Sequence, residues 1–108
     1  MDFVKVTEAS EIPTGTMKKI TINGKEILIA NVNGTYYAIG NYCTHKSGDL
    51  SQGTLEASIV TCPKHKAKFD VTTGKVISGP KLLFSPKISD EPSYQVKVEG
   101  KDILVKTE

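Results

Sequence analysis

The chain has 108 residues, of which 38% are hydrophobic and 24% charged, and its formal net charge is +2. These values are typical of one globular domain spanning residues 1–108, and no apolar run reaches the ~20 residues of a membrane span. All fourteen basic residues are lysines, so recognition of nucleic acid by bidentate guanidinium groups is not expected, and neither is a membrane partner.

The first third of the chain predicts β-strands. After one short helical turn at Glu8–Pro13, segments Thr16–Ile22 and Lys25–Val32 are rich in β-branched residues and flank an Asn-Gly pair, a strong hairpin signal. A second pair, Asn33-Gly34, leads into Thr35–Ile39 and predicts a second hairpin. The first third is therefore expected to be a run of hairpin-connected strands.

Residues 43–87 differ in composition, because glycine and proline interrupt them repeatedly. Two short apolar segments, Ser58–Thr61 and Lys68–Val71, are candidate strands, each meeting a cluster of cysteine and histidine at one end. The region holds seven lysines against three acidic residues, an excess of four positive charges. It is predicted to be a small subdomain that carries two loops.

The C-terminal segments Tyr94–Glu99 and Asp102–Lys106 alternate apolar and polar residues about Gly100-Lys101, which predicts a third hairpin. The expected fold class is all-β: an antiparallel β-sandwich or barrel with a small inserted subdomain. Its basal part would comprise residues 1–42 and 88–108, and the insert residues 43–87.

Both cysteines and both histidines lie in two short motifs, Cys43-Thr44-His45 and Cys62-Pro63-Lys64-His65. Two thiolates and two imidazoles can hold one tetrahedral zinc, which is the first candidate on ligand count. The N-terminal residues MDFVKVTEAS lack the apolar core of a signal peptide, so a cytoplasmic location is expected. In that reducing compartment, metal binding is favoured over a disulfide.

The pairing of one cysteine with one histidine in each motif suits two metals better than one. Zinc sites usually group cysteine with cysteine and histidine with histidine. In a [2Fe–2S] cluster of the Rieske type, one iron takes both thiolates and the other both imidazoles. Replacing two thiolates by neutral imidazoles makes the oxidised cluster neutral rather than doubly negative, so it accepts an electron more readily.

The motif order CTH, sixteen residues, CPKH, then FDVTTG and Ser78-Gly79-Pro80 is highly specific. On these residues the chain resembles Rieske-type [2Fe–2S] ferredoxins, small carriers that serve oxygenases. The resemblance runs from Phe3 to about Lys106. It implies a Rieske-type β-fold with an inserted cluster-binding subdomain and one [2Fe–2S] cluster as cofactor.

The resemblance also assigns roles to residues. It implies that Cys43 and Cys62 bind one iron, and that His45 and His65 bind the other through Nδ1. Residues Gly79 and Pro80 match a proline loop that shields the cluster from a third side.

The function implied is one-electron transport from an NAD(P)H-dependent flavoprotein reductase to a terminal oxygenase, with no catalytic residue and no organic substrate of its own. A second hypothesis is a small Rieske-like subunit of a larger reductase, such as a nitrite reductase. A third is a structural zinc module, which metal analysis would separate from both. The possession of all four ligands favours an active carrier over the second hypothesis.

High-potential relatives carry one further cysteine in each loop, and the matching positions here are Gly48 and Lys64, so that disulfide cannot form. Those relatives also place Ser and Tyr hydroxyls against the cluster sulfurs, where this chain has Ala67 and Phe69. Such hydrogen bonds stabilise the reduced state, so their absence predicts a potential of about −150 mV rather than about +300 mV.

Two positions depart from the family, because Ser47 and Lys66 stand where glycine is usual, and Lys66 puts the geometry of the second loop in question. Four lysines near the ligands suggest either an ordinary solvated surface or a collar that steers an acidic partner; they are Lys46, Lys64, Lys66 and Lys68.

Several neighbouring residues have plain structural expectations. We expect Leu50 and Phe69 to pack beneath the loops, and Tyr42 to be a core or rim aromatic rather than an electron relay. Residues Asp70 and Thr72–Gly74 are predicted to form the turn after the second loop.

Overall fold

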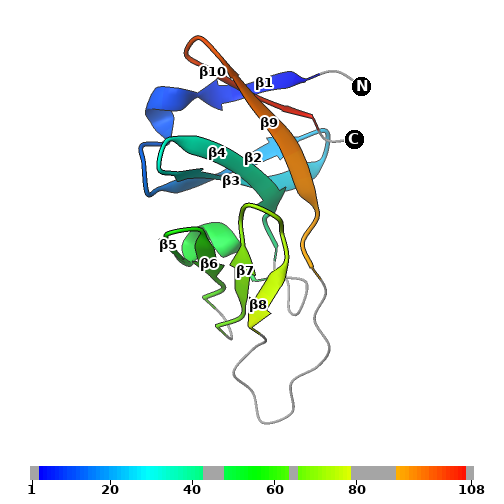
Figure 1. Cartoon of the computed structure of the whole chain (residues 1–108). Coiled ribbons are helices and arrows are strands. Elements are labelled where there is room, and N and C mark those ends of the chain that lie inside the picture. The colour runs from blue at the N-terminus through cyan, green and yellow to red at the C-terminus, as the bar shows by residue number, and fades with distance from the viewer. Residues whose placement is uncertain (1–2, 43–47, 64–65, 79–89, 107–108) are drawn as a thin grey trace.

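The computed structural model describes residues 3–42, 48–63, 66–78 and 90–106 and shows two antiparallel sheets, one above the other in Figure 1. The large sheet has the order β1-β10-β9-β4-β3-β2 and the small sheet the order β5-β6-β7-β8. Among the described residues, no helix is long and apolar enough to cross a membrane. The strands of the large sheet are β1 (Val4–Glu8), β2 (Met17–Ile22), β3 (Lys25–Val32), β4 (Thr35–Gly40), β9 (Ser93–Glu99) and β10 (Asp102–Lys106).

The small sheet lies between β4 and β9 in the sequence. Its strands are β5 (Thr54–Glu56), β6 (Ile59–Thr61), β7 (Lys68–Asp70) and β8 (Val76–Ser78), and 3-10 turns form at η1 (Ala9–Glu11) and η2 (Leu50–Gln52). The all-β prediction is confirmed, as are the helical turn near residue 9 and both candidate strands. Strands β1, β5 and β8 and the turn η2 were not predicted.

All three predicted hairpins are present, and their turns explain the choice of residues. Asn23 and Gly24 have φ values of 51° and 76°, and Asn33 and Gly34 have φ values of 54° and 90°. Two successive residues with positive φ between paired strands are the requirement of a type I′ turn, which Asn-Gly meets at low steric cost. In the third hairpin, Glu99 pairs with Asp102 and Gly100 has a φ of 61°.

Strand β3 is buried on both faces. Ile27 and Ile29 join the core inside the large sheet, whereas Leu28 and Ala30 join the core between the two sheets. Because side chains alternate along a strand, a continuous apolar run such as Ile27–Ala30 indicates burial on both sides. Strand β3 is therefore a wall shared by two hydrophobic cores.

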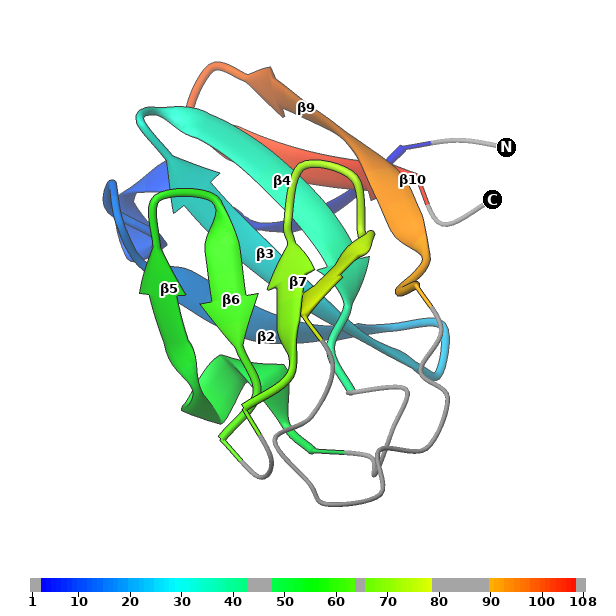
Figure 2. The same cartoon turned by 60° about the horizontal axis from the view of Figure 1, so that its bottom comes forward.

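The second core packs the small sheet against the large one, as Figure 2 shows with β5, β6 and β7 in front of β3 and β4. Val60 of β6 and Phe69 of β7 are fully buried and stand opposite each other in the strand register. They contribute to the same cluster as Leu50, so the expected packing of Leu50 and Phe69 is confirmed.

Residues 90–92 tie the two sheets together from the C-terminal side. The Glu91 N–H donates to Gly74 O at 2.7 Å, and the Gly40 N–H donates to Pro92 O at 2.9 Å. A Cβ atom on Gly40 would lie 2.5 Å from Glu91 Oε1, and one on Gly74 would lie 2.3 Å from Glu91 O. The two glycines thus admit Glu91 between the end of β4 and the turn after β7.

Candidate metal centre

Cys62, one of the four predicted ligands, begins the tight loop between β6 and β7. It follows directly on Thr61, which pairs with Lys68 across the two strands. The Cys62 N–H donates to Ala67 O at 2.7 Å, and Cys62 O accepts from the Lys66 N–H at 3.1 Å. The strand register and these two bonds fix the base of the loop, here called the second ligand loop (residues 62–67). The thiol side chain of Cys62 is buried and makes no disulfide.

Lys66 adopts a backbone conformation that explains why glycine is usual there. Its φ of 65° lies in the left-handed region, which most L-residues avoid and glycine enters freely. The departure from glycine at position 66 therefore does not change the backbone conformation: the loop keeps a left-handed residue there and carries a Cβ in that conformation. The Lys66 side chain itself is exposed.

The wall beside Cys62 is apolar. Ala67 and Phe69 are fully buried and belong to the same hydrophobic cluster as Cys62. Neither side chain has a hydrogen-bond donor, whereas a Ser or Tyr in their places would bring a hydroxyl into this interior. Burial of a group among such apolar side chains disfavours added negative charge on it.

The turn after β7 is formed as predicted. Asp70 Oδ1 accepts from the Thr72 N–H at 2.9 Å and from Thr72 Oγ1 at 2.7 Å. Asp70 O accepts from the N–H groups of Thr73 and Gly74, and Gly74 has a φ of 82°. This turn sends the chain back into β8, which pairs with β7 and completes the small sheet.

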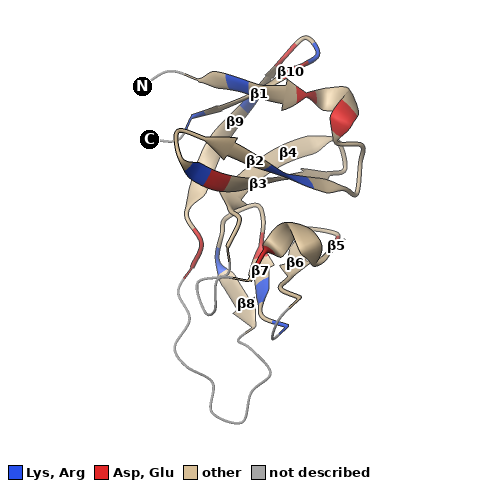
Figure 3. Ribbon diagram, turned by 180° about the vertical axis from the view of Figure 1, so that it is seen from behind, with Lys and Arg blue, Asp and Glu red and all other residues tan. Residues whose placement is uncertain are grey.

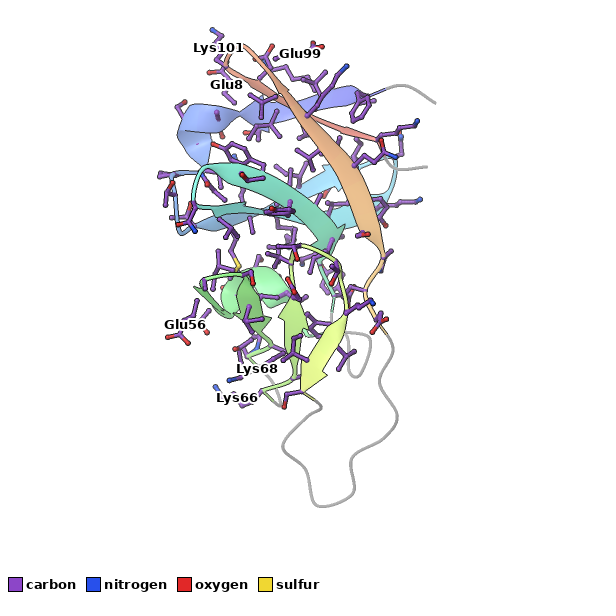
Figure 4. All side chains as sticks on the ribbon, in the orientation of Figure 1. Glu8, Glu56, Lys66, Lys68, Glu99 and Lys101 are labelled. Carbon is purple, nitrogen blue, oxygen red and sulfur yellow. The ribbon has the colours of Figure 1, made fainter. Side chains whose placement is uncertain are left out.

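Of the remaining predicted site residues, only two lysines lie in the part of the chain that the structure describes. Lys66 is exposed and Lys68 is half-buried, and Figure 4 shows both at the end of the molecule opposite Glu8, Glu99 and Lys101. In Figure 3 lysine segments mark the lower end of β7, away from the acidic segment of η1. Seven predicted residues lie outside the described part of the chain: Cys43, His45, His65, Lys46, Lys64, Gly79 and Pro80.

Within the described ranges, no group of three or more His, Cys, Asp or Glu side chains could hold a metal ion. Three of the four expected ligands lie outside those ranges, so the ligand set stays a prediction. What the described residues provide is one buried thiol at the base of a fixed loop, and the two ends of the segment that carries Cys43 and His45.

Sequence reasoning missed a polar group at the ends of that segment. Asn41 is fully buried, and its Nδ2 donates to Asp49 Oδ1 at 2.8 Å. Burial raises the pKa of Asp49, but hydrogen bonds from Ser51, Asn41 and Lys19 outweigh it and hold that pKa below its ordinary value. The hydrogen bond with Asp49 and the negative charge of Asp49 in turn raise the pKa of Lys19. An available signal was the pattern Asp-x-Ser, which favours a side chain to backbone turn.

A family model described as the Rieske [2Fe-2S] domain matches residues 2–88. This chain is a Rieske protein. The ferredoxin component of naphthalene 1,2-dioxygenase/salicylate 5-hydroxylase systems from a Ralstonia species is 39% identical over 98 residues, covering 91% of this chain and 88% of that protein. The ferredoxin component of biphenyl 2,3-dioxygenase from Rhodococcus jostii is 35% identical and covers all of this chain and 95% of that one.

Solved structures agree with these relatives. The ferredoxin of carbazole 1,9a-dioxygenase from Nocardioides aromaticivorans IC177 superposes with a TM-score of 0.87 at 29% identity, covering 100% of both chains. A chain in a complex of reduced oxygenase and oxidized ferredoxin of carbazole 1,9a-dioxygenase gives a TM-score of 0.86 at 30% identity, covering 98% of this Rieske protein. The expected Rieske fold is therefore confirmed.

The chain's own residues fit the cofactor of the family, a [2Fe–2S] cluster. The donor set of two thiols and two imidazoles matches what its two irons require. Cys62 is buried at the end of β6, in a loop whose backbone is fixed by hydrogen bonds. Ala67 and Phe69 are fully buried in the same hydrophobic cluster as that thiol, so its side chain lies against apolar groups rather than solvent.

Proposed function

We propose that this protein is a one-electron carrier that takes electrons from an NAD(P)H-dependent flavoprotein reductase and delivers them to a terminal oxygenase in the cytoplasm. The observation that carries the proposal is the match over 86–95% of the length of curated dioxygenase ferredoxin components, at 30–39% identity. The match spans the carriers themselves rather than one part of an enzyme. It supports a protein without catalytic residues of its own.

We assign Cys43 and Cys62 to one iron and His45 and His65 to the other. Gly79 and Pro80 are assigned to shielding, and residues 43–87 to a cluster-binding insert in a single domain. The bound group supplies a single-electron couple. The protein contributes the loop that holds Cys62, the dry wall around it and the tuning of the couple. Without hydroxyl donors at positions 67 and 69, that couple is proposed to lie near about −150 mV.

The partner surface is proposed to surround the ligand loops. Lys66 and Lys68 are supported as half of the predicted lysine collar, because both lie on or beside β7 next to Cys62 and the side chain of Lys66 is exposed. With Lys46 and Lys64, they would attract a partner surface rich in carboxylates. Such attraction raises the association rate at low salt and weakens as ions screen it.

The first test is chemical analysis of the anaerobically purified protein. Two irons and two acid-labile sulfides per chain, with a one-electron wave near the low end of the Rieske range in protein-film voltammetry, are the expected result. Equimolar zinc without sulfide would refute the proposal in favour of a structural zinc module. A wave well above zero would refute the assignment to oxygenase-type carriers.

The second test addresses the partner. Stopped-flow reduction by a ferredoxin reductase of a ring-hydroxylating dioxygenase should slow as salt is raised. Replacement of Lys66 and Lys68 by glutamine should lower the rate at low salt and flatten this dependence. The matched control replaces Lys97, which lies on β9 of the large sheet, and Lys101, which Figure 4 shows at the far end of the molecule, and should leave the rate unchanged. Equal effects of both pairs would refute the collar.

A further inference from the structure

Residues on the two sides of the segment 43–48 are joined by backbone hydrogen bonds. The Leu50 N–H donates to Asn41 O at 2.9 Å, and Tyr42 forms an antiparallel bridge with Asp49. The Asn41 N–H donates to Glu26 O at 3.0 Å, which anchors this junction to the β3 side of the large sheet. Only six residues separate Tyr42 from Asp49, and they include Cys43 and His45. We call residues 43–48 the first ligand loop.

Three side chains reinforce the junction. Asn41 Nδ2 donates to Asp49 Oδ1 at 2.8 Å, and the Ser51 N–H reaches both Asn41 Oδ1 at 3.2 Å and Asp49 Oδ1 at 3.0 Å. Ser51 Oγ donates to the same carboxylate oxygen at 2.5 Å. Asn41 is fully buried, so loss of any of its partners would leave a polar group unsatisfied in the interior. These residues, Asn41, Asp49 and Ser51, are here called the loop clasp.

Lys19, on the edge strand β2, contacts residues on both sides of the first ligand loop. Lys19 Nζ lies 3.3 Å from Asp49 Oδ2 and 5.9 Å from the centroid of the Tyr42 ring. It therefore contacts the last residue before the first ligand loop and the first residue after it. The Lys19 side chain is about one-third exposed, so its ion pair is a minor contribution beside the buried hydrogen bonds.

We propose that the loop clasp is a positioning device for the metal centre: Asn41, Asp49 and Ser51 hold the ends of the first ligand loop together, so that Cys43 and His45 are presented to the cluster in one geometry. This inference rests on the proposed function. A ligand loop that is already closed loses little entropy on binding iron. A loop with open ends would release iron more easily, because local opening precedes loss of the metal.

The chain contains a matched control for this idea. Asp70 makes the same local turn as Asp49, accepting from the N–H and the hydroxyl of the residue two positions on. The Asp70 turn, however, lies after β7 and spans no predicted ligand. Asp49→Ala and Asp70→Ala therefore remove the same local hydrogen bonds, but only the first opens the clasp.

The experiment compares the cluster-loaded wild-type protein with Asn41→Ala, Asp49→Ala and Asp70→Ala. The rate of iron transfer from each protein to a colorimetric chelator is measured, together with the EPR spectrum of the reduced protein. We expect Asn41→Ala and Asp49→Ala to release iron about tenfold faster or more, as for loss of outer-shell partners in other metal sites, with broadened EPR features. Asp70→Ala should keep the wild-type rate and spectrum, even if its thermal stability falls.

The conservative variant Asp49→Asn separates hydrogen bonding from charge. Its amide oxygen can still accept from Asn41 and Ser51, so the release rate should stay near that of wild type. If the alanine variants fail to fold, Ser51→Ala removes one donor from the clasp and should give a smaller acceleration of iron release.

Equal release rates for Asp49→Ala, Asp70→Ala and wild type would overturn the clasp while leaving the proposed function intact. A tenfold acceleration by Asp49→Asn would also overturn it, because charge rather than hydrogen bonding would then be responsible. A wild-type protein that holds no iron–sulfur cluster would refute the proposed function, and the clasp inference with it.

Discussion

Replacing Lys66 by glycine should stabilise this protein, although it removes a whole side chain. Lys66 has a φ of 65°, and the left-handed conformation costs a residue with a Cβ roughly 1–2 kcal/mol. Its side chain is exposed, so truncation loses no buried contact. Glycine gains flexibility in the unfolded chain, which costs about 0.4–1 kcal/mol. The expected net gain is about 0.5–1 kcal/mol, or a rise in the unfolding midpoint of about 2–8 °C.

The assay is thermal unfolding of the cluster-loaded protein at one fixed scan rate, because loss of the cluster makes the transition irreversible. Two controls isolate the backbone effect. Lys66→Ala removes the charge but keeps the Cβ, so its midpoint should stay near that of wild type. Lys68→Gly removes the same charge from the extended strand β7 and should destabilise by about 0.5–1 kcal/mol.

A lower midpoint for Lys66→Gly than for Lys66→Ala would refute this reasoning. It would mean that the conformation at position 66 carries no cost, or that the lysine side chain contributes a contact that outweighs it.

Three further predictions concern Gly53, Phe69 and Tyr94. A Cβ added at Gly53 would lie 1.9 Å from Thr61 O, so Gly53→Ala must move the strand that leads into Cys62. We expect this variant to lose about 1–3 kcal/mol of unfolding free energy in a urea titration and to hold less iron. An unchanged unfolding free energy and iron content would contradict the close packing. Phe69→Tyr brings a hydroxyl to the dry wall of the metal centre and should raise the reduction potential by about 60 mV or more, as measured by voltammetry, whereas no rise would show that position 69 does not face the cluster. Burial, with a smaller effect of the negative charge on Glu91, raises the pKa of Tyr94 above its ordinary value of 10.0. The stability that this neutral phenol contributes is present below pH 10.0 and is lost as the pH rises through the folded pKa. Above pH 10.0 the urea midpoint should therefore fall more steeply for wild type than for Tyr94→Phe, and parallel slopes would argue against it.

The hairpins of the large sheet were predictable because their signals are local. Asn23-Gly24 and Asn33-Gly34 specify turns by their own conformational preferences, and the flanking β-branched residues specify strands. The turn between β5 and β6 gave no such signal, because Ala57 occupies its left-handed position with a φ of 55°. There the pairing of Leu55 with Val60 over the core decides the structure, and a turn residue of the wrong type is tolerated.

The sequence predicts ligands for the candidate metal centre, but it does not predict the residues that support them. Cys62 and its motif are visible in the sequence, since few residue types can bind iron. The role of Asn41 depends on its burial and on the return of the chain at Asp49, and neither is encoded in local spacing. Likewise Gly40 and Gly74 lie far apart in the sequence, and their joint contact with Glu91 becomes visible only when both sheets are in place.

The two-sided burial of β3 has a consequence for transplanting this metal centre into other proteins. The small sheet cannot bury its apolar face by itself, because Leu28 and Ala30 of β3 supply one side of the hydrophobic core that contains Cys62 and Phe69. A graft of residues 43–87 onto a foreign scaffold would expose that apolar surface to water. The smallest portable unit is thus the insert together with β3 and β4, and a recipient sheet must offer a strand whose opposite face is already filled.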